Sequence, residues 1–282
     1  MIHRAGLRAR LRLEERRHGM RSRAQVACFA YHEVTDDPAA SGFQRPGADR
    51  YKLSRRAFTQ HLNQIAMGPR RPALVAEVDL TAPGRHLLLT FDDGGRSAQY
   101  VSEELLKRGW KGHFFIVTSL VGTRTFLDAE GIRQISSCGH VIGSHSHTHP
   151  NIFREQSLDA MVEQWRTSCD ALSQLLGQPC TMASVPGGDI SRTVLHSAAV
   201  AGLRYLFTSE PWLTPRDVER CWVLGRFCPK IGTSASDVGD LARFRGWTRA
   251  LMLRRLKGLA RRTVPSLYRL YVRRMTTPRE PA

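Results

Sequence analysis

The sequence lacks long apolar runs, paired cysteines and internal repeats. No stretch of the 282 residues approaches the roughly 18 apolar residues that a membrane-spanning helix needs. The six cysteines form no C-x-x-C pair, and scattered cysteines in a reducing compartment are usually small buried hydrophobic residues, so we assign them no role. No repeat with a period of about 20–50 residues is present, which excludes solenoids and propellers.

A charge excess is also lacking in the middle of the chain, although the net charge is +17. Residues 1–25 carry eight Arg and two Glu, residues 241–282 carry twelve Lys or Arg and one Glu, and the 22 basic and 22 acidic residues of 26–240 cancel. We therefore expect a basic leader over 1–25, a neutral folded domain over 26–240 and a basic tail over 241–282. Charged ends indicate which surfaces a protein touches rather than its chemistry, so a nucleic-acid partner is not expected.

The Arg-rich leader has no apolar segment after it and therefore does not read as a secretory signal peptide. We expect the protein to remain in the cytoplasm. Met20 is an alternative start of the chain, and with that start most of the leader would be absent.

Short apolar runs alternate with helical patterns through the central domain, which predicts an α/β fold with a mostly parallel sheet. In such folds the chemistry collects in the loops at the carboxyl ends of the strands. The expected strands cover residues 26–31, 86–91, 113–117, 141–142, 181–185, 205–207 and 222–224, and the expected helices cover 53–66, 98–108 with Ser97 as N-cap, 128–137, 158–176 and 192–201.

Two adjacent carboxylates, Asp92 and Asp93, follow the expected strand 86–91 in the sequence Thr-Phe-Asp-Asp-Gly. Neighbouring side chains at a strand end point in different directions, so one carboxylate can bind a cation while the other accepts a proton. Asp-Asp-Gly is also common turn chemistry, and a turn followed by a helix cap is the alternative interpretation.

Three histidines occur within five residues after the expected strand 141–142. His145 and His149 are four residues apart, so one helical turn or a tight loop can place both imidazoles on one face at metal-ligand distance. Two histidines and one carboxylate leave positions open for water and substrate, as in catalytic metal sites. His147 would face away from the other two and is expected to take no part.

Together the two motifs resemble those of the polysaccharide deacetylase family, also called the NodB-homology or carbohydrate esterase family 4. Thr-Phe-Asp-Asp-Gly at 90–94 is similar to the first family motif, and His-Ser-His-Thr-His at 145–149 to the second. The resemblance covers about residues 26–226. It implies a distorted (β/α) barrel and a metal-dependent hydrolase that removes acetyl groups from N-acetylated sugars.

The resemblance also implies roles for individual residues. Asp92 would be the general base, and Ser146 would stabilise the histidine loop by a hydrogen bond. The metal, usually zinc, would be held by Asp93, His145 and His149. Metal coordination lowers the pKa of bound water and polarises the acetyl carbonyl, while a backbone N–H helps to stabilise the oxyanion.

The later motifs depart from the family pattern. The third motif usually contains an Arg that orients the base, but this chain has Ser-Val-Pro-Gly-Gly-Asp at 184–189, and the Arg is missing. Gly187 and Gly188 would still offer an oxyanion N–H, with Asp189 lining the groove, although a simple glycine turn is the alternative. Of the fourth motif only Trp212 remains, as a wall of the pocket.

The chain also lacks the carboxyl-terminal Leu-x-His that supplies the catalytic acid in many members. Tyr31-His32 follows the first strand and is similar to the segment that supplies a histidine acid in the branch of poly-N-acetylglucosamine deacetylases. By this resemblance His32 would protonate the departing amine. A hydrogen-bonded structural histidine is the alternative.

The basic tail has helical spacing of apolar residues, and Pro265 is expected to separate two short helices. Such a tail suits the anionic cytoplasmic face of a membrane, but it would also suit an anionic polymer or fold back on the barrel. We expect a deacetylase of an N-acetylhexosamine-containing saccharide, such as an N-acetylglucosamine polymer, in exopolysaccharide or other cell-surface polysaccharide metabolism. The alternatives are a catalytically weak carbohydrate-binding relative and a protein that binds membranes or anionic polymers through its tails.

Overall fold

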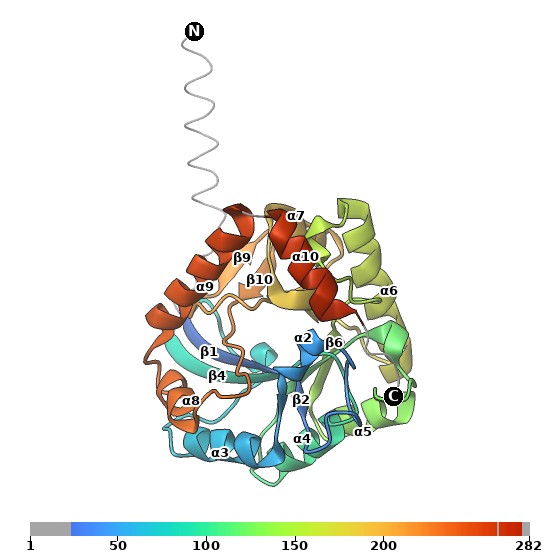
Figure 1. Cartoon of the computed structure of the whole chain (residues 1–282). Helices are drawn as coiled ribbons and strands as arrows, with labels where there is room; N and C mark the ends of the chain where they lie inside the picture. Colours follow the sequence, from blue (N-terminus) through green and yellow to red (C-terminus); the bar gives the residue numbers. More distant parts are fainter. Residues whose placement is uncertain (1–23, 264, 278–282) are drawn as a thin grey trace.

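The structure, a computed structural model, describes residues 24–263 and 265–277 (Figure 1). Nearly all of the basic leader, the alternative start at Met20 and the last five residues of the tail lie outside the described residues. In the part that is described, no helix combines the length and the apolar character needed to span a membrane.

An eight-stranded sheet curls around the centre of the molecule, with the strand order β1-β4-β5-β6-β7-β8-β10-β9. Neighbouring strands are parallel except for β9 and β10, which are antiparallel. The large sheet consists of β1 (Ala24–Tyr31), β4 (Gly84–Phe91), β5 (His113–Ile116), β6 (Val141–Ser144), β7 (Met182–Ser184), β8 (Tyr205–Phe207), β9 (Arg216–Val218) and β10 (Cys221–Leu224). A second sheet pairs β2 (Glu33–Val34) with β3 (Lys52–Leu53).

Helices surround the curled sheet (Figure 1). They are α2 (Pro46–Asp49), α3 (Arg55–Ala66), α4 (Ala98–Leu106), α5 (Ala129–Ser137), α6 (Leu158–Leu176), α7 (Arg192–Val200), α8 (Ala235–Ala242), α9 (Trp247–Thr263) and α10 (Pro265–Thr276).

The curled sheet closes through the segment that follows β10, which hydrogen-bonds to β1. The N–H of Ala30 in β1 donates to the carbonyl of Phe227, 2.8 Å away, and the N–H of Phe227 donates to the carbonyl of Cys28 at 2.9 Å. The segment after β10 therefore lies beside β1 and closes the sheet. The predicted α/β fold, a distorted (β/α) barrel, is confirmed.

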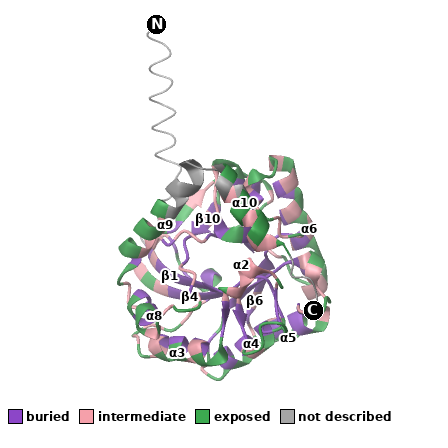
Figure 2. Ribbon diagram, in the orientation of Figure 1, coloured by how far each residue is buried: buried purple, intermediate pink, exposed green. Residues whose placement is uncertain are grey.

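Strand side chains alternate between the inside and the outside of the barrel, as the period of a β-strand requires. Cys28, Leu88 and Phe207 come from three different strands and share one buried cluster inside the barrel. Phe29 points the other way and belongs to the cluster that includes Phe58 of α3. Burial is accordingly concentrated in the strands and on the inner faces of the helices (Figure 2).

All seven expected strands and five expected helices are found, with bounds shifted by at most a few residues. Ser97 does not cap α4 with its side chain; its hydroxyl donates to Glu33 at 2.6 Å and accepts from the N–H of Val34. Elements missed by the sequence analysis are short or polar: β2, β3, β9, α2 and α8.

The basic tail forms α9 and α10, and the chain breaks between them at Pro265 as expected. α10 folds back over the open end of the barrel and packs on α2 (Figure 1). The packing is close, since a Cβ added to Gly47 would lie 2.9 Å from the carbonyl oxygen of Met275. Of the three alternatives for the tail, folding back on the barrel is therefore observed, and the boundaries at 25/26 and 240/241 stay predictions.

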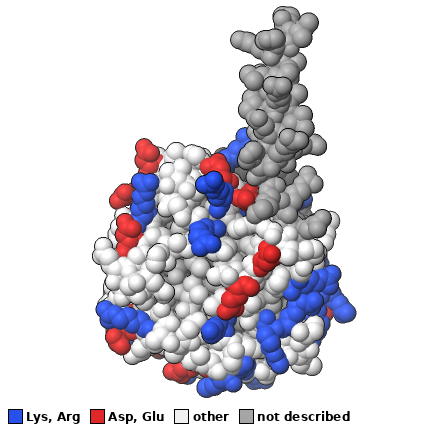
Figure 3. All heavy atoms as spheres, turned by 180° about the vertical axis from the view of Figure 1, so that it is seen from behind, with Lys and Arg blue, Asp and Glu red and all other residues white. Residues whose placement is uncertain are grey.

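The surface opposite to the view of Figure 1 carries Lys and Arg interspersed with Asp and Glu (Figure 3). This mixture agrees with the balanced charge of residues 26–240.

Candidate active site

A cavity of about 920 Å³ lies at the carboxyl ends of the barrel strands. Its wall combines the loops that follow β1, β4, β6, β7 and β10 with residues of α2, α9 and α10. Both polar motifs of the sequence reach it, because the carboxyl ends of parallel strands lie at one edge of the sheet.

Asp93, His145 and His149 lie together at this cavity, and one donor atom of each falls within 4.8 Å of the other two. Oδ1 of Asp93 is 3.3 Å from Nε2 of His145 and 3.8 Å from Nε2 of His149. The backbone here is unusual: Asp93, Ser146 and His149 have φ angles of 76°, 65° and 52°. Non-glycine residues seldom adopt positive φ, and such strain collects at functional sites.

The histidine loop is held in place by hydrogen bonds. Nδ1 of His145 lies 2.9 Å from the carbonyl oxygen of Ser184, so Nδ1–H donates there and Nε2 points at Asp93. The hydroxyl of Ser146 accepts from the N–H of His149 at 3.0 Å, which is the contact expected of it. His147 lies apart from the cluster, with Nδ1 3.0 Å from the hydroxyl of Thr118.

The charges of the cluster favour cation binding. Burial opposes the ionisation of Asp93, but the neighbouring His145 and the charge of His32 hold the pKa of Asp93 below its ordinary value. Burial, with His145 and Arg45 nearby, lowers the pKa of His149 to about 3. The cluster therefore offers an ionised carboxylate and a neutral His149 imidazole, the forms that bind metals.

The donor set fits a divalent cation. Asp93 contributes a carboxylate oxygen, each histidine contributes a ring nitrogen, and the second ring nitrogen of His145 is occupied by a backbone carbonyl. A hydrogen bond of this kind fixes the tautomer of a metal-ligating histidine. Three protein donors leave coordination positions open, as in catalytic rather than structural sites.

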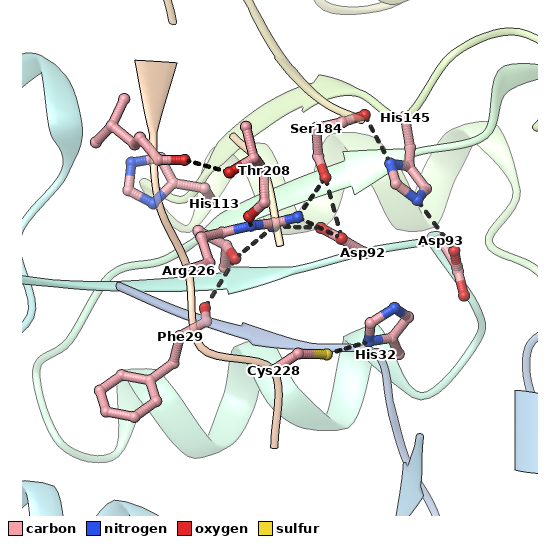
Figure 4. Close-up of polar contacts among 12 residues, drawn as sticks. Phe29, His32, Asp92, Asp93, His113, His145, Ser184, Thr208, Arg226 and Cys228 are labelled. Carbon is pink, nitrogen blue, oxygen red and sulfur yellow. Dashed lines mark hydrogen bonds and ion pairs between the residues drawn. The ribbon is translucent and has the colours of Figure 1, made fainter. Parts of the chain in front are cut away.

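Asp92 points away from the cluster and is paired with Arg226 (Figure 4). The two guanidinium nitrogens lie 2.8 and 2.9 Å from the two carboxylate oxygens, and both side chains are buried. Burial opposes the ionisation of Asp92, but Arg226 outweighs it and holds the pKa of Asp92 below its ordinary value. Ser184 donates a further hydrogen bond to Asp92 at 3.0 Å.

Arg226 corrects the expectation that the orienting arginine is missing. It follows β10 rather than lying in the third motif, and it reaches Asp92 from the segment that lies beside β1, the neighbour of β4. Its remaining donors reach the carbonyl of Thr208 and the hydroxyl of Thr90. A sequence signal was available, since Arg226 is separated by only Gly225 from the apolar run 221–224, after which chemistry is expected.

His32 lines the cavity on the β1 side, below Asp92 and Asp93 in the view of Figure 4. Its Nδ1 is 3.9 Å from the sulfur of Cys228, and its ring lies against Tyr51 with 4.6 Å between centroids. Burial alone would lower the pKa of His32, but Cys228 and the two carboxylates raise it to about 9.

The loop after β7 is arranged differently from the expectation. Gly187 and Gly188 line the cavity, but the N–H of Gly188 donates to the carbonyl of Val185 at 2.8 Å and is not available to an oxyanion. This leaves Gly187 as the candidate donor of the pair. Asp189 does not line the cavity and instead pairs with Arg254 of the tail at 2.6 Å.

Trp212 does not line the cavity either, and its neighbour Pro211 takes that place. The indole packs against Gly225, whose added Cβ would be 2.6 Å from the ring, and Arg216 lies over its other side at 4.0 Å. The expectation that Trp212 forms a pocket wall is therefore wrong, because the chain turns the ring into the protein.

Arg45 and Glu33 are among the cavity residues that the sequence analysis missed. The guanidinium of Arg45 lies 3.4 Å from Nδ1 of His149 and packs on Phe43. Glu33, next to His32, is buried and accepts from the hydroxyls of Ser41 and Ser97. Neither lies in a motif, so nothing in the sequence pattern marked them.

Comparison with known proteins agrees with this geometry. The family profile described as "Polysaccharide deacetylase" matches residues 79–206. The Bacillus subtilis protein YxkH, whose name refers to a polysaccharide deacetylase, is 23% identical over 226 residues, or 77% of this chain and 75% of its own. The peptidoglycan-N-acetylglucosamine deacetylase PgdA of Listeria monocytogenes is 26% identical over 49% of this chain, but only 29% of its own length.

Solved structures share the fold. The deacetylase PplD of Streptococcus pyogenes, solved with acetate, superposes with a TM-score of 0.63 at 19% identity over 76% of this chain and 96% of that one. IcaB from Ammonifex degensii gives 0.63 at 20% identity over 77% and 97%. The profile match over 79–206, together with both motifs at one cavity, makes this part of the chain similar to the polysaccharide deacetylase family, and the solved structures show that the chain shares their fold.

Proposed function

We propose that this protein is a metal-dependent hydrolase that removes N-acetyl groups from a saccharide containing N-acetylhexosamine. The observation that carries the proposal is the placement of the Asp93, His145 and His149 donors beside the Asp92–Arg226 pair at one cavity. A cation held by these three residues, for which we propose zinc, lowers the pKa of a bound water and polarises a carbonyl.

Asp92 is the proposed general base. Arg226 keeps the carboxylate ionised in spite of burial and holds both of its oxygens in a fixed orientation. A general base must be deprotonated and within hydrogen-bond reach of the proton it removes. The pairing thus prepares Asp92 to accept the proton of the attacking water, while the N–H of Gly187 is the proposed donor to the oxyanion.

His32 is the proposed acid that protonates the departing amine. The carboxylates and Cys228 favour its charged form, which is the form an acid needs. A divalent cation at the cluster would repel this charge and bring the pKa of His32 back toward neutrality, where general acids work best.

The substrate and the compartment are proposed from the family and the sequence. PgdA is named for peptidoglycan N-acetylglucosamine, and N-acetylglucosamine polymers are therefore the first substrates to test. A cytoplasmic location and a part in cell-surface polysaccharide metabolism, including exopolysaccharide synthesis, remain predictions. The alternative of a catalytically weak carbohydrate-binding relative was based mainly on the missing arginine of the third motif. It is less well supported because Arg226 pairs with Asp92 instead.

Acetate release tests the proposal. The wild type, Asp92→Asn and His32→Ala are compared on chitooligosaccharides and on β-1,6-linked N-acetylglucosamine oligomers, and the metal content of each protein is measured. We expect near-stoichiometric metal in all three and activity only in the wild type, with losses of at least about 100-fold, in the range of general acid–base catalysis.

Two results would count against the proposal. Bound metal without acetate release from any substrate would favour the carbohydrate-binding relative. Full activity of Asp92→Asn would remove the base from its proposed role. His147→Ala serves as a matched control within the histidine loop, since His147 lies apart from the donor cluster and is no proposed reacting group.

A further inference from the structure

Exposed apolar side chains gather on the tail helices. Nine large apolar residues are exposed among the described residues, and five of them lie on α9 and α10, with exposed fractions between 49% and 65%. These five are Met252, Leu253, Leu256, Leu270 and Tyr271. Figure 2 shows exposed residues on the coloured parts of both helices. Exposed apolar groups that cluster in this way mark an interaction site, whereas single ones do not.

This apolar surface is continuous with the rim of the cavity. Leu253 and Tyr271 are half exposed and also line the cavity, so they connect its inside with the outer faces of α9 and α10. Arg254 of α9, which also lines the cavity, fixes this helix to the barrel by its pairs with Asp189 at 2.6 Å and Glu210 at 3.0 Å. The surface is therefore held in a fixed position at the cavity mouth.

The charge of the same surface has one sign. No Asp or Glu occurs between residues 241 and 279, and among the side chains that the structure describes on the two helices, four arginines are exposed: Arg249, Arg255, Arg273 and Arg274. The opposite side of the molecule, by contrast, mixes both signs (Figure 3). A surface that is apolar and basic together complements anionic headgroups above acyl chains.

We propose that α9 and α10 dock the protein on an anionic lipid bilayer and hold the cavity mouth at the membrane surface. Basic residues alone would also suit RNA, but exposed Met and Leu side chains gain nothing from a phosphate backbone. Docking would place the cavity mouth where a saccharide attached to a membrane lipid can reach it. We therefore infer that the acetylated substrate is lipid-linked, an inference that rests on the proposed function.

Vesicle co-sedimentation of the full chain tests the docking. The vesicles contain either phosphatidylcholine alone or phosphatidylcholine with phosphatidylglycerol. The variant Met252→Ser/Leu256→Ser removes apolar area without changing charge, and neither residue lines the cavity. The matched control is Met67→Ser, because Met67 is 71% exposed at the end of α3, away from the tail helices.

We expect the wild type to prefer the anionic vesicles, and the double variant to lose at least about ten-fold in affinity while the control binds normally. Raising the salt from about 0.1 M to about 1 M, which shortens the Debye length from about 10 to about 3 Å, should weaken wild-type binding. Unchanged circular dichroism verifies that the double variant is folded.

Equal binding of the double variant and the wild type, or equal binding to both vesicle types, would overturn the proposal. A single-stranded RNA oligomer that competes with the vesicles for the protein, and that the double variant binds as tightly as the wild type does, would also overturn it. Acetate release from free oligosaccharides separates the two proposals: vesicle binding by a chain that hydrolyses no substrate supports docking and contradicts the proposed function.

Discussion

Replacing Arg226 by methionine tests the pair on which the proposed base depends. The guanidinium is fully buried and makes contacts of 2.8 and 2.9 Å to the two oxygens of Asp92, besides its hydrogen bonds to Thr90, Ser184 and Thr208. Methionine fills much of the same space without a charge, so the substitution leaves Asp92 as a buried carboxylate without its partner.

The expected loss is about 3–5 kcal/mol of unfolding free energy, which is the cost of leaving a buried charge uncompensated. The pKa of Asp92 should rise as well, because Arg226 is what outweighs the effect of burial in the wild type. In the variant Asp92→Asn/Arg226→Met neither charge is present, and we expect it to be at least about 2 kcal/mol more stable than Arg226→Met.

Urea unfolding of the wild type, both single variants and the double variant measures these differences. With a slope of about 3 kcal/mol/M, the midpoint of Arg226→Met should fall by about 1–1.7 M. Arg226→Lys should lie between the wild type and Arg226→Met, since it keeps the charge but loses the bidentate geometry.

The reasoning would be refuted by an Arg226→Met protein within about 1 kcal/mol of the wild type, or by a double variant no more stable than that single one. Either result would mean that Asp92 is not held as a buried ion by Arg226.

Three further predictions concern the metal, pH and the tail. Asp93→Ala should abolish stoichiometric metal binding in a titration calorimeter while His147→Ala retains it, because only the first residue belongs to the donor cluster; normal binding by Asp93→Ala would exclude the site. Burial holds the pKa of His113 at about 4, below the 6.5 of the unfolded chain, so stability is complete above pH 6.5 and should fall by about 3 kcal/mol as the pH drops toward 4. The urea midpoint at several pH values measures this, and His113→Gln should have a flatter profile; an identical profile would contradict the assignment. Arg254→Ala should speed chymotrypsin cleavage within the tail about ten-fold relative to the wild type, and Arg255→Ala, which removes an exposed neighbour, should not; equal rates would show that Arg254 does not anchor the tail.

The sequence was sufficient to predict which residues reach the active-site edge of the sheet. Asp92, Asp93 and the histidine loop each follow a buried strand, and in a parallel α/β fold the loops after such strands meet at one edge. Helix ends were also locally encoded: Ser54 accepts from the N–H of Ala57 at the start of α3, and Gly177 ends α6 with a φ of 66°. These features depend on neighbours within a few residues.

The contacts that complete the site join residues far apart in the chain. Arg226 is 134 positions from Asp92, and nothing in the local pattern says that the segment after β10 will lie beside β1, next to β4. The same holds for the tail, whose helical pattern was visible but whose place was not. Arg254 reaches Asp189 over 65 positions, which turns a stretch expected to lie outside the domain into a wall of the cavity.

Residue type and spacing thus determined the strands, the ligand cluster and the position of the proposed base. Closure of the barrel decided the rest: it supplied Arg226, turned Trp212 away from the cavity and engaged the N–H of Gly188 with Val185. The physical reason is that periodicity and capping act over one or two turns of chain, whereas a buried charge finds its partner, and an aromatic ring its packing, only when the whole sheet has closed.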